Sequence, residues 1–398
     1  MPRLASRMSR AVPSAIMAVA EKAKRLKAEG RDIISFSIGV PGFLPGPHVY
    51  EAARAALAKD SGAYGSNRGP DALLDAWIGF LARNGLPGYT RREVATGVGG
   101  KHVLFQVMYA LFDEGDEILI PTPYWTSYVD IAEILGLKIK LLRCGSEHDY
   151  KVSAERLAEA LTPETRGVLL NNPSNPTGMV YDRDEMQGIA DVLAGHSCWI
   201  LSDDIYSQLI FDGIGWQNVL KCRPELRDRT VIMDSISKSY GMPGWRVGYL
   251  AGPAAVADAV TTLNSNSITN LPEVVNAAAI AALNGPQDAT VQACADFAKK
   301  RDLVLAALEG LPGIHCPRPR GAFYVFPDIS GCYGKRHGDR LIETDSDFCD
   351  ALLDAKGVAC VPGRAFGEPN ALRISYACAD AVLVDGLARI ADFVRGLS

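Results

Sequence analysis

The stretch Ser235–Gly248, SISKSYGMPGWRVG, places a lysine among small residues and an arginine eight positions later. Lys238 follows the apolar run TVIMD, which is typical of a buried strand rather than of a charged helix surface. One interpretation is a tight strand-to-helix loop that carries two solvated cations. The other is a reactive amine at Lys238 beside an anion site to which Arg246 contributes its guanidinium group.

Polar side chains also follow other strand-like runs. WILSDDIY ends an apolar run in two adjacent aspartates, the first of which is Asp203, and Tyr206 comes shortly after them. Adjacent carboxylates are costly to bury without partners. LLNNPSNPTG contains Asn175 and has the composition of a turn. GVGGK places Gly100 and Lys101 at the start of a predicted helix, where free backbone N–H groups can bind an anion.

The elements that must position these residues alternate between β-rich runs and amphipathic helical patterns from about residue 47 to residue 285. This alternation predicts an α/β fold with a mostly parallel sheet flanked by helices. Ligands bind such sheets at the carboxyl ends of the strands, so we expect the polar residues above to meet there. After Gly285 strands and helices mix in the α+β manner, which indicates a smaller second domain.

We predict three regions along the chain. Residues 1–13 form an N-terminal arm, residues 46–285 form the large domain, and residues 14–45 pair with 286–398 in the small domain. Within the small domain, Ser14 is expected to begin a first helix and Gly30 to end it.

The composition describes an ordinary globular protein with a net charge of −5. No basic stripe occurs, which argues against a nucleic-acid or anionic-membrane partner. The 9 cysteines are scattered singly, a pattern that favours reduced thiols over disulfides or a metal site. No run of about 18 apolar residues is present. The basic start of the chain resembles a transit peptide only weakly, and we expect a cytoplasmic protein.

The order of the motifs is more specific than any single one. A glycine-rich helix start, SNPTG, DDIY and SISKSYGMPGWRVG follow one another, together with SIGVPGF, AYGSNRGP, GAFYVF and ALRISYA. This order resembles the class I/II pyridoxal-phosphate-dependent aminotransferases of the aspartate aminotransferase fold (fold type I), and within them the bacterial aspartate/aromatic subgroup. The resemblance covers nearly the whole chain. It implies bound pyridoxal 5′-phosphate and a homodimer with shared active sites.

The resemblance assigns the chemistry to three residues. Lys238 would bond covalently to the cofactor's aldehyde and, once displaced by substrate, move a proton as a base. Asp203 would keep the pyridine nitrogen protonated. Tyr206, with Asn175, would hydrogen-bond the ring's phenolic oxygen. The neighbouring Asp204 is expected to be structural.

The remaining implied contacts concern the cofactor's ring and phosphate and the substrate. Ring and phosphate contacts would come from Gly100, Lys101, Trp125, Ser235 and Arg246, and from Tyr64 and Asn270 of the neighbouring subunit. Arg373 would bind the substrate α-carboxylate bidentately. Gly39 would lie beside that carboxylate, and Asn175 and Trp125 would also contact the substrate.

The sequence departs from acid-specific relatives at one position. Ser265 stands where those relatives carry an arginine for the substrate's side-chain carboxylate, and the GVPGF segment lacks two acids common in the subgroup. Possible substitutes for the missing arginine are Lys101, Arg68 and His102. The best assignment is a ping-pong transfer from an aspartate or aromatic donor to a 2-oxoglutarate-type acceptor.

Other interpretations stay open at this stage. The same cofactor and fold can support a C–S lyase, a cyclase or an amino-acid-modifying enzyme of a specialised pathway, because fold does not fix reaction type. A non-catalytic regulatory module would be a different class of protein. A nicotinamide-dependent dehydrogenase would need a glycine-rich fingerprint in its first βαβ unit, and none is found.

Overall fold

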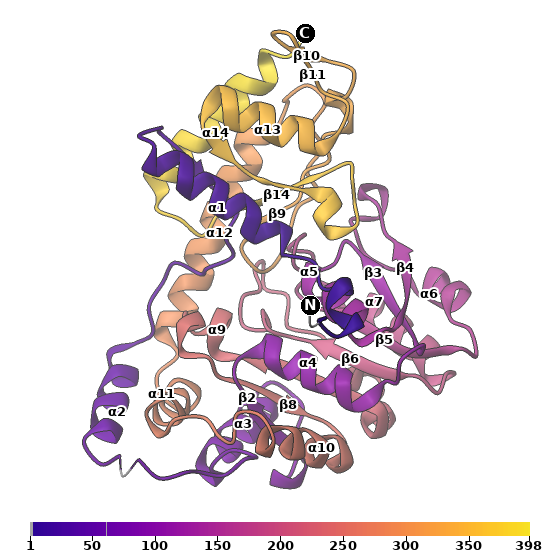
Figure 1. Ribbon diagram of the computed structural model, residues 1–398, viewed down its shortest axis with the longest axis vertical. Coiled ribbons are helices and arrows are strands. Elements are labelled where there is room, and N and C mark those ends of the chain that lie inside the picture. Colours follow the sequence, from indigo (N-terminus) through magenta and orange to yellow (C-terminus); the bar gives the residue numbers. More distant parts are fainter. Residues whose placement is uncertain (1–2, 61) are drawn as a thin grey trace.

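The computed structural model describes residues 3–60 and 62–398. Its largest sheet has seven strands in the order β2-β8-β7-β6-β5-β3-β4 (Figure 1). The strands are β2 (Val94–Gly97), β3 (Glu117–Thr122), β4 (Lys138–Arg143), β5 (Thr165–Asn171), β6 (Trp199–Asp203), β7 (Thr230–Ser235) and β8 (Gly248–Ala251). β8 is antiparallel to both of its neighbours, and the other strand pairs are parallel. The predicted mostly parallel sheet is confirmed.

Helices cover both faces of this sheet. Successive side chains of a strand point to opposite faces, and on β5 Leu169 joins one apolar cluster while Val168 and Leu170 join another. The first cluster includes helices α4 (Gly100–Leu111), α5 (Thr126–Leu135) and α10 (Ala254–Ser265). The second includes α2 (Pro47–Leu57), α3 (Asp71–Arg83), α6 (Ala154–Ala160), α7 (Arg183–Ala194), α8 (Val219–Cys222) and α11 (Glu273–Asn284).

Because β8 runs antiparallel to β7, it begins at the same edge of the sheet at which β7 ends. Gly248, the first residue of β8, pairs with both Ser235 at the end of β7 and Gly97 at the end of β2. The connecting segment contains α9 (Ile236–Ser239) and Arg246, whose φ of 58° is left-handed. A Cβ at Gly248 would meet the backbone of Gly99 and Gly100, so the strand and the start of α4 approach closely there.

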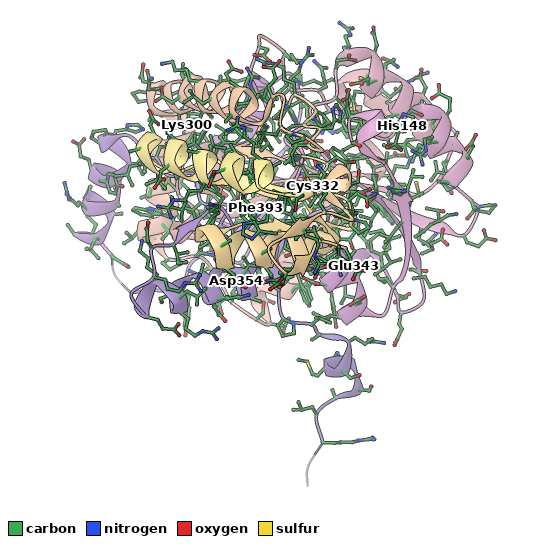
Figure 2. The ribbon with its side chains drawn as sticks, turned by 90° about the horizontal axis from the view of Figure 1, so that it is seen from above. His148, Lys300, Cys332, Glu343, Asp354 and Phe393 are labelled. Atoms are coloured by element: carbon green, nitrogen blue, oxygen red, sulfur yellow. The ribbon has the colours of Figure 1, made fainter. Side chains whose placement is uncertain are left out.

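A smaller layer packs over the carboxyl edge of the sheet (Figure 1). It contains helices α1 (Ala15–Ala28), α12 (Asp288–Leu308), α13 (Asp345–Lys356) and α14 (Asp380–Arg395). Its strands are β1 (Ile34–Ser35), β9 (Tyr324–Val325), β10 (Arg336–His337), β11 (Arg340–Leu341), β12 (Val358–Ala359), β13 (Val361–Pro362) and β14 (Leu372–Ser375). β14 lies between β13 and β9, antiparallel to both, and β1 pairs with β12. Phe393 of α14, labelled in Figure 2, packs edge-on against Phe348 of α13.

The first helix runs from Ala15 to Ala28, as the pattern between Ser14 and Gly30 predicts, although the Ser14 side chain makes no capping hydrogen bond. Residues 3–13, which precede this helix, project from the body of the molecule (Figure 2). The core of the small layer also takes in Tyr206 and Leu209 of the large layer. The exact domain boundaries stay a prediction. Within residues 3–60 and 62–398, no helix is long and apolar enough to cross a bilayer.

Candidate active site

A pocket lies where the carboxyl edge of the large sheet meets the small layer. Its lining includes eight of the residues singled out from the sequence: Gly39, Lys101, Trp125, Asn175, Asp203, Tyr206, Lys238 and Arg373. They are spread over more than 330 positions of the chain, from residue 39 to residue 373. The polar residues that follow the strands therefore meet at one edge of the sheet in the folded chain, as expected.

Lys238 lies in α9, directly after β7, and its Nζ donates a hydrogen bond to the carbonyl oxygen of Gly39. Burial, together with the positive charges of Arg373 and Arg246, lowers the pKa of this amine to about 8, while Asp203 opposes the shift. An amine with such a pKa is substantially neutral slightly above neutral pH. A neutral amine is the form that attacks a carbonyl carbon or accepts a proton.

Asp203 is the last residue of β6 and is buried. Burial raises the pKa of its carboxyl group to about 6, while a hydrogen bond from the Tyr128 hydroxyl, 2.6 Å from Oδ2, works in the opposite direction. The sequence alone did not point to Tyr128, although it stands three residues after Trp125. That spacing at the start of α5 places two side chains on one helix face, and their rings meet edge-on at 5.5 Å.

The second aspartate of the DDIY motif has a different environment. Asp204 accepts hydrogen bonds from Ser202 Oγ, Trp216 Nε1 and Asn218 Nδ2, at 2.8, 3.2 and 2.9 Å. It does not line the pocket, and burial raises its pKa to about 7. These donors explain how two adjacent aspartates can both be buried, since each carboxylate has its own hydrogen-bond partners.

Arg373 extends from β14 toward the large layer and is 1% exposed. Its Nη1 donates to Asn175 Oδ1 at 2.9 Å, and its Nη2 donates to the Ser37 carbonyl at 2.5 Å. Its Nε is buried without a partner among the described residues. No carboxylate lies within ion-pair distance of this guanidinium in that part of the chain. A buried cation with a free donor suits an anionic ligand.

A second cationic region lies at the start of α4. A Cβ at Gly99, whose φ is 80°, would collide with the guanidinium of Arg246, and a Cβ at Gly100 would lie 3.8 Å from Ser235 Oγ. Arg246 donates to the carbonyls of Pro243 and Val98 and, within the described ranges, forms no ion pair. Uncapped helix N–H groups, a serine hydroxyl and an unpaired guanidinium together fit a phosphate.

Comparison with known proteins identifies the family to which this chain belongs. The family model for aminotransferase class I and II matches residues 31–390. The chain belongs to this family. The aspartate/prephenate aminotransferase of Cereibacter sphaeroides is 41% identical over 398 residues, covering 99% of each chain. The aspartate aminotransferase of Geobacillus stearothermophilus is 37% identical, with the same coverage. The chain is therefore a transaminase of PLP fold type I.

Solved structures agree with this assignment. The aspartate aminotransferase of Rhizobium meliloti superposes with a TM-score of 0.97 at 38% identity and covers 100% of both chains. That of Thermus thermophilus with maleate gives 0.91 at 33% identity, covering 99% of this chain and 100% of the other. Aminotransferases of this family use pyridoxal phosphate, and the pocket of this chain fits it, because the cations Lys101, Arg246 and Arg373 all lie close enough to the Lys238 amine to lower its pKa.

Of the residues assigned to the site, Gly100, Ser235 and Arg246 lie in the cationic region at the start of α4 rather than in the pocket lining. Tyr64 and Asn270 also lie outside the pocket of this single chain, as does Ser265, where acid-specific relatives carry an arginine. Tyr64 is 89% exposed, Asn270 is in an adjoining segment, and Ser265 ends α10, where its Oγ donates to the Thr262 carbonyl. A Cβ at Gly65 would lie 3.3 Å from Asn270 Nδ2, so Tyr64 and Asn270 are neighbours. Their assignment to a partner's site stays a prediction.

The three basic candidates for side-chain recognition occupy different places. Arg68 forms an ion pair with Asp258 and donates to backbone carbonyls, and His102 accepts the Val98 N–H at 3.2 Å. Only Lys101 lines the pocket, with its Nζ 5.1 Å from the centroid of the Trp125 ring. Tyr324 also lines the pocket. It belongs to the GAFYVF motif, but the motif by itself assigns no role to the tyrosine.

Proposed function

We propose that this aminotransferase is a cytoplasmic homodimer that transfers the amino group of aspartate, or of a related donor, to a 2-oxoglutarate-type acceptor. The observation that carries the proposal is a pair of cations in one pocket, Arg373 and Lys101, neither of which forms an ion pair within 4 Å among the described residues. Two such cations suit a substrate with two carboxylates. The relatives named aspartate aminotransferases support this choice, as does the Thermus thermophilus structure with maleate, which is a dicarboxylate.

In the proposed mechanism, pyridoxal phosphate, when bound, supplies an aldehyde that accepts the amino group and a ring that takes up electrons released at the substrate's Cα. Lys238 holds the cofactor and, as a neutral amine, accepts and returns the Cα proton. Asp203 holds a proton on the pyridine nitrogen. Arg373 orients the substrate through its α-carboxylate, and its free Nε adds to the donors available for that contact.

The dimer is proposed from exposed groups that a soluble monomer rarely presents together. Tyr64 is 89% exposed, and Leu4, Met8 and Val12 of the N-terminal segment are 80%, 49% and 62% exposed. Exposed apolar side chains like these become buried when they form a subunit contact. In a dimer, Tyr64 and Asn270 would reach the cofactor of the partner.

The test is an absorbance spectrum of the purified protein with added pyridoxal phosphate, repeated with single L-amino acids and no oxo acid. We expect the visible band of the lysine-bound cofactor to convert to the band of pyridoxamine phosphate, fastest with aspartate. A release of oxo acid without pyridoxamine phosphate would favour a lyase or cyclase instead. The absence of any visible band would contradict the assignment of this site.

Donor preference is tested separately at Lys101. In Lys101→Met, we expect kcat/KM for aspartate to fall about tenfold relative to that for alanine, because only aspartate has a second carboxylate to lose a partner. Lys138→Met, at an exposed position of β4, is the matched control. Equal losses for both donors would remove Lys101 from side-chain recognition while leaving transamination intact.

A further inference from the structure

Tyr324 lies where the small layer meets two catalytic loops of the large layer. The Ala322 N–H donates to the Leu209 carbonyl at 2.9 Å, and the Phe211 N–H donates to the Arg320 carbonyl at 2.7 Å. These bonds fasten the segment before Tyr324 to the loop that carries Tyr206. Arg320 and Gly321 both donate to the Gly178 carbonyl in the SNPTG loop.

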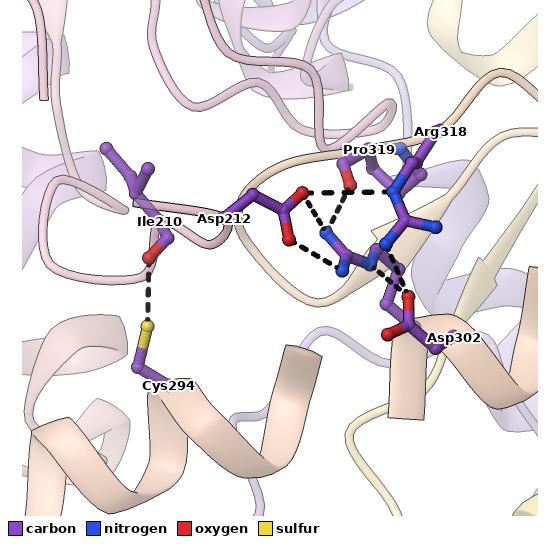
Figure 3. A network of polar contacts seen from close by, with 7 residues as sticks. Ile210, Asp212, Cys294, Asp302, Arg318 and Pro319 are labelled. Atoms are coloured by element: carbon purple, nitrogen blue, oxygen red, sulfur yellow. Dashed lines mark hydrogen bonds and ion pairs between the residues drawn. The ribbon is translucent and has the colours of Figure 1, made fainter. Parts of the chain in front are cut away.

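A charged network holds the same junction. Arg301 of α12 is 1% exposed and contacts both carboxylate oxygens of Asp212, at 2.7 and 2.9 Å, and the Pro319 carbonyl at 3.1 Å. Figure 3 shows Asp212, Pro319 and Arg318 converging on this point. The backbone positions of Tyr206 and Tyr324 are therefore fixed relative to each other by contacts outside the pocket.

The two tyrosine hydroxyls meet inside the pocket, with an oxygen–oxygen distance of 2.9 Å. Both side chains are buried, at 2% and 1% exposure. Neither hydroxyl has another hydrogen-bond partner among residues 3–60 and 62–398. Each hydroxyl can donate one proton and can accept more than one. If Tyr324 donates, the proton of Tyr206 remains available to a ligand; if Tyr206 donates, it does not.

The surroundings favour Tyr324 as the donor. The Arg373 guanidinium lies 4.7 Å from the centroid of the Tyr324 ring. Burial raises the pKa of both phenols, and the positive charge of Arg373 works to lower both. The negative charge of Asp203 raises the pKa of Tyr206 only, and the contact between the two hydroxyls lowers that of Tyr324 and raises that of Tyr206. The more acidic hydroxyl of a pair is the better donor.

Gly39 preserves the position of this hydroxyl. A Cβ at Gly39 would collide with Tyr324 Oη, so only glycine leaves room for the phenol there. The same Gly39 accepts the hydrogen bond from Lys238. The hydroxyl of Tyr324 thus lies between the backbone that contacts the reactive lysine and the side chain of Tyr206.

We propose that Tyr324 is a positioning residue that donates its hydroxyl proton to Tyr206, so that Tyr206 directs its own proton to the phenolic oxygen of the cofactor. This inference rests on the proposed contact of Tyr206 with the cofactor. Donation from Tyr324 polarises the Tyr206 O–H bond and makes it a stronger donor. A stronger donor stabilises the negative ring oxygen and lowers the pKa of the lysine-bound cofactor.

The experiment titrates the visible band of the loaded enzyme with pH in the wild type and in Tyr324→Phe. We expect Tyr324→Phe to raise the midpoint by about 0.5–1 pH unit, because the free energy of one neutral hydrogen bond corresponds to a pKa shift of about that size. Tyr206→Phe should raise it further. In the double variant, the loss of Tyr324 should add no shift, since its effect passes through Tyr206.

Tyr376→Phe is the matched control, because it removes a buried hydroxyl of the same layer that has no hydrogen-bond partner among the described residues. It should leave the midpoint unchanged, and thermal unfolding should confirm that each variant is folded. A lowered midpoint in Tyr324→Phe would mean that Tyr206 is the donor and would overturn the inference, as would an equal shift in the Tyr206→Phe background. If the wild type shows no titrating band, the proposed function itself fails.

Discussion

The two sides of the pocket are supported by sheets of very different size. Asp203 ends the five-residue strand β6 inside a seven-stranded sheet, and Lys238 follows the six-residue strand β7. Tyr324 begins the two-residue strand β9, and Arg373 lies in β14 within a three-stranded sheet. In the proposed mechanism, the sheet side carries the groups that act on protons. The small layer carries the groups proposed to bind and orient the substrate, which is compatible with closure of one layer on the other.

The largest effect should come from the sheet side. Lys238→Ala removes the amine proposed to hold the cofactor and to move the Cα proton, so we expect transamination to fall below detection while some cofactor still binds through the phosphate region. Stopped-flow and steady-state assays with aspartate would measure this. Near-normal turnover would contradict the division of roles between the two sides.

Arg373→Ala tests the small layer. We expect a loss of about 2–5 kcal/mol in substrate binding, because the substrate carboxylate would lose a buried cationic partner. The loss should fall mainly on KM, while the spectrum of the lysine-bound cofactor remains visible. If kcat/KM stays unchanged, Arg373 does not contact the substrate, and the small layer has no recognition role at this point.

The junction between the two sides is tested at Asp212, which is the bidentate partner of buried Arg301. Asp212→Asn keeps the shape and tolerates the φ of 62°. It weakens charge-assisted hydrogen bonds, so we expect a loss of about 1–3 kcal/mol in the free energy of unfolding, measured with urea. Asp296→Asn removes an exposed α12 pair with Lys299 and should cost far less.

A smaller, graded effect concerns pH. Because the pKa of Lys238 is lowered to about 8, the neutral fraction of the amine rises about tenfold per pH unit below 8 and levels off above it. The rate at which added pyridoxal phosphate bonds to the cofactor-free enzyme should follow this profile. Arg373→Ala removes a neighbouring positive charge and should move the profile to higher pH. A rate that still rises tenfold between pH 9 and pH 10 would mean that Lys238 is not perturbed.

The sequence predicted the sheet side more completely than the small layer. Each β-rich run of the large domain is a strand, and Asp203 and Lys238 follow from their places after such runs. Tyr324 could not be assigned in this way, because its importance depends on contact with Tyr206, 118 positions away. Similarly, Arg68 could be set apart from Lys101 only once its pairing with Asp258 was visible. Local patterns do not encode such long-range contacts.

The reversed strand β8 has a consequence for protein engineering. Residues 236–247 leave and re-enter the sheet at one edge, with Ser235 and Gly248 paired across it. An inserted or deleted residue would either break that pairing or displace Lys238 relative to Arg246. The strand pairing at its two ends therefore fixes the length of this segment. Grafting it into another protein would require a host sheet in which the strand after the segment is antiparallel to the strand before it.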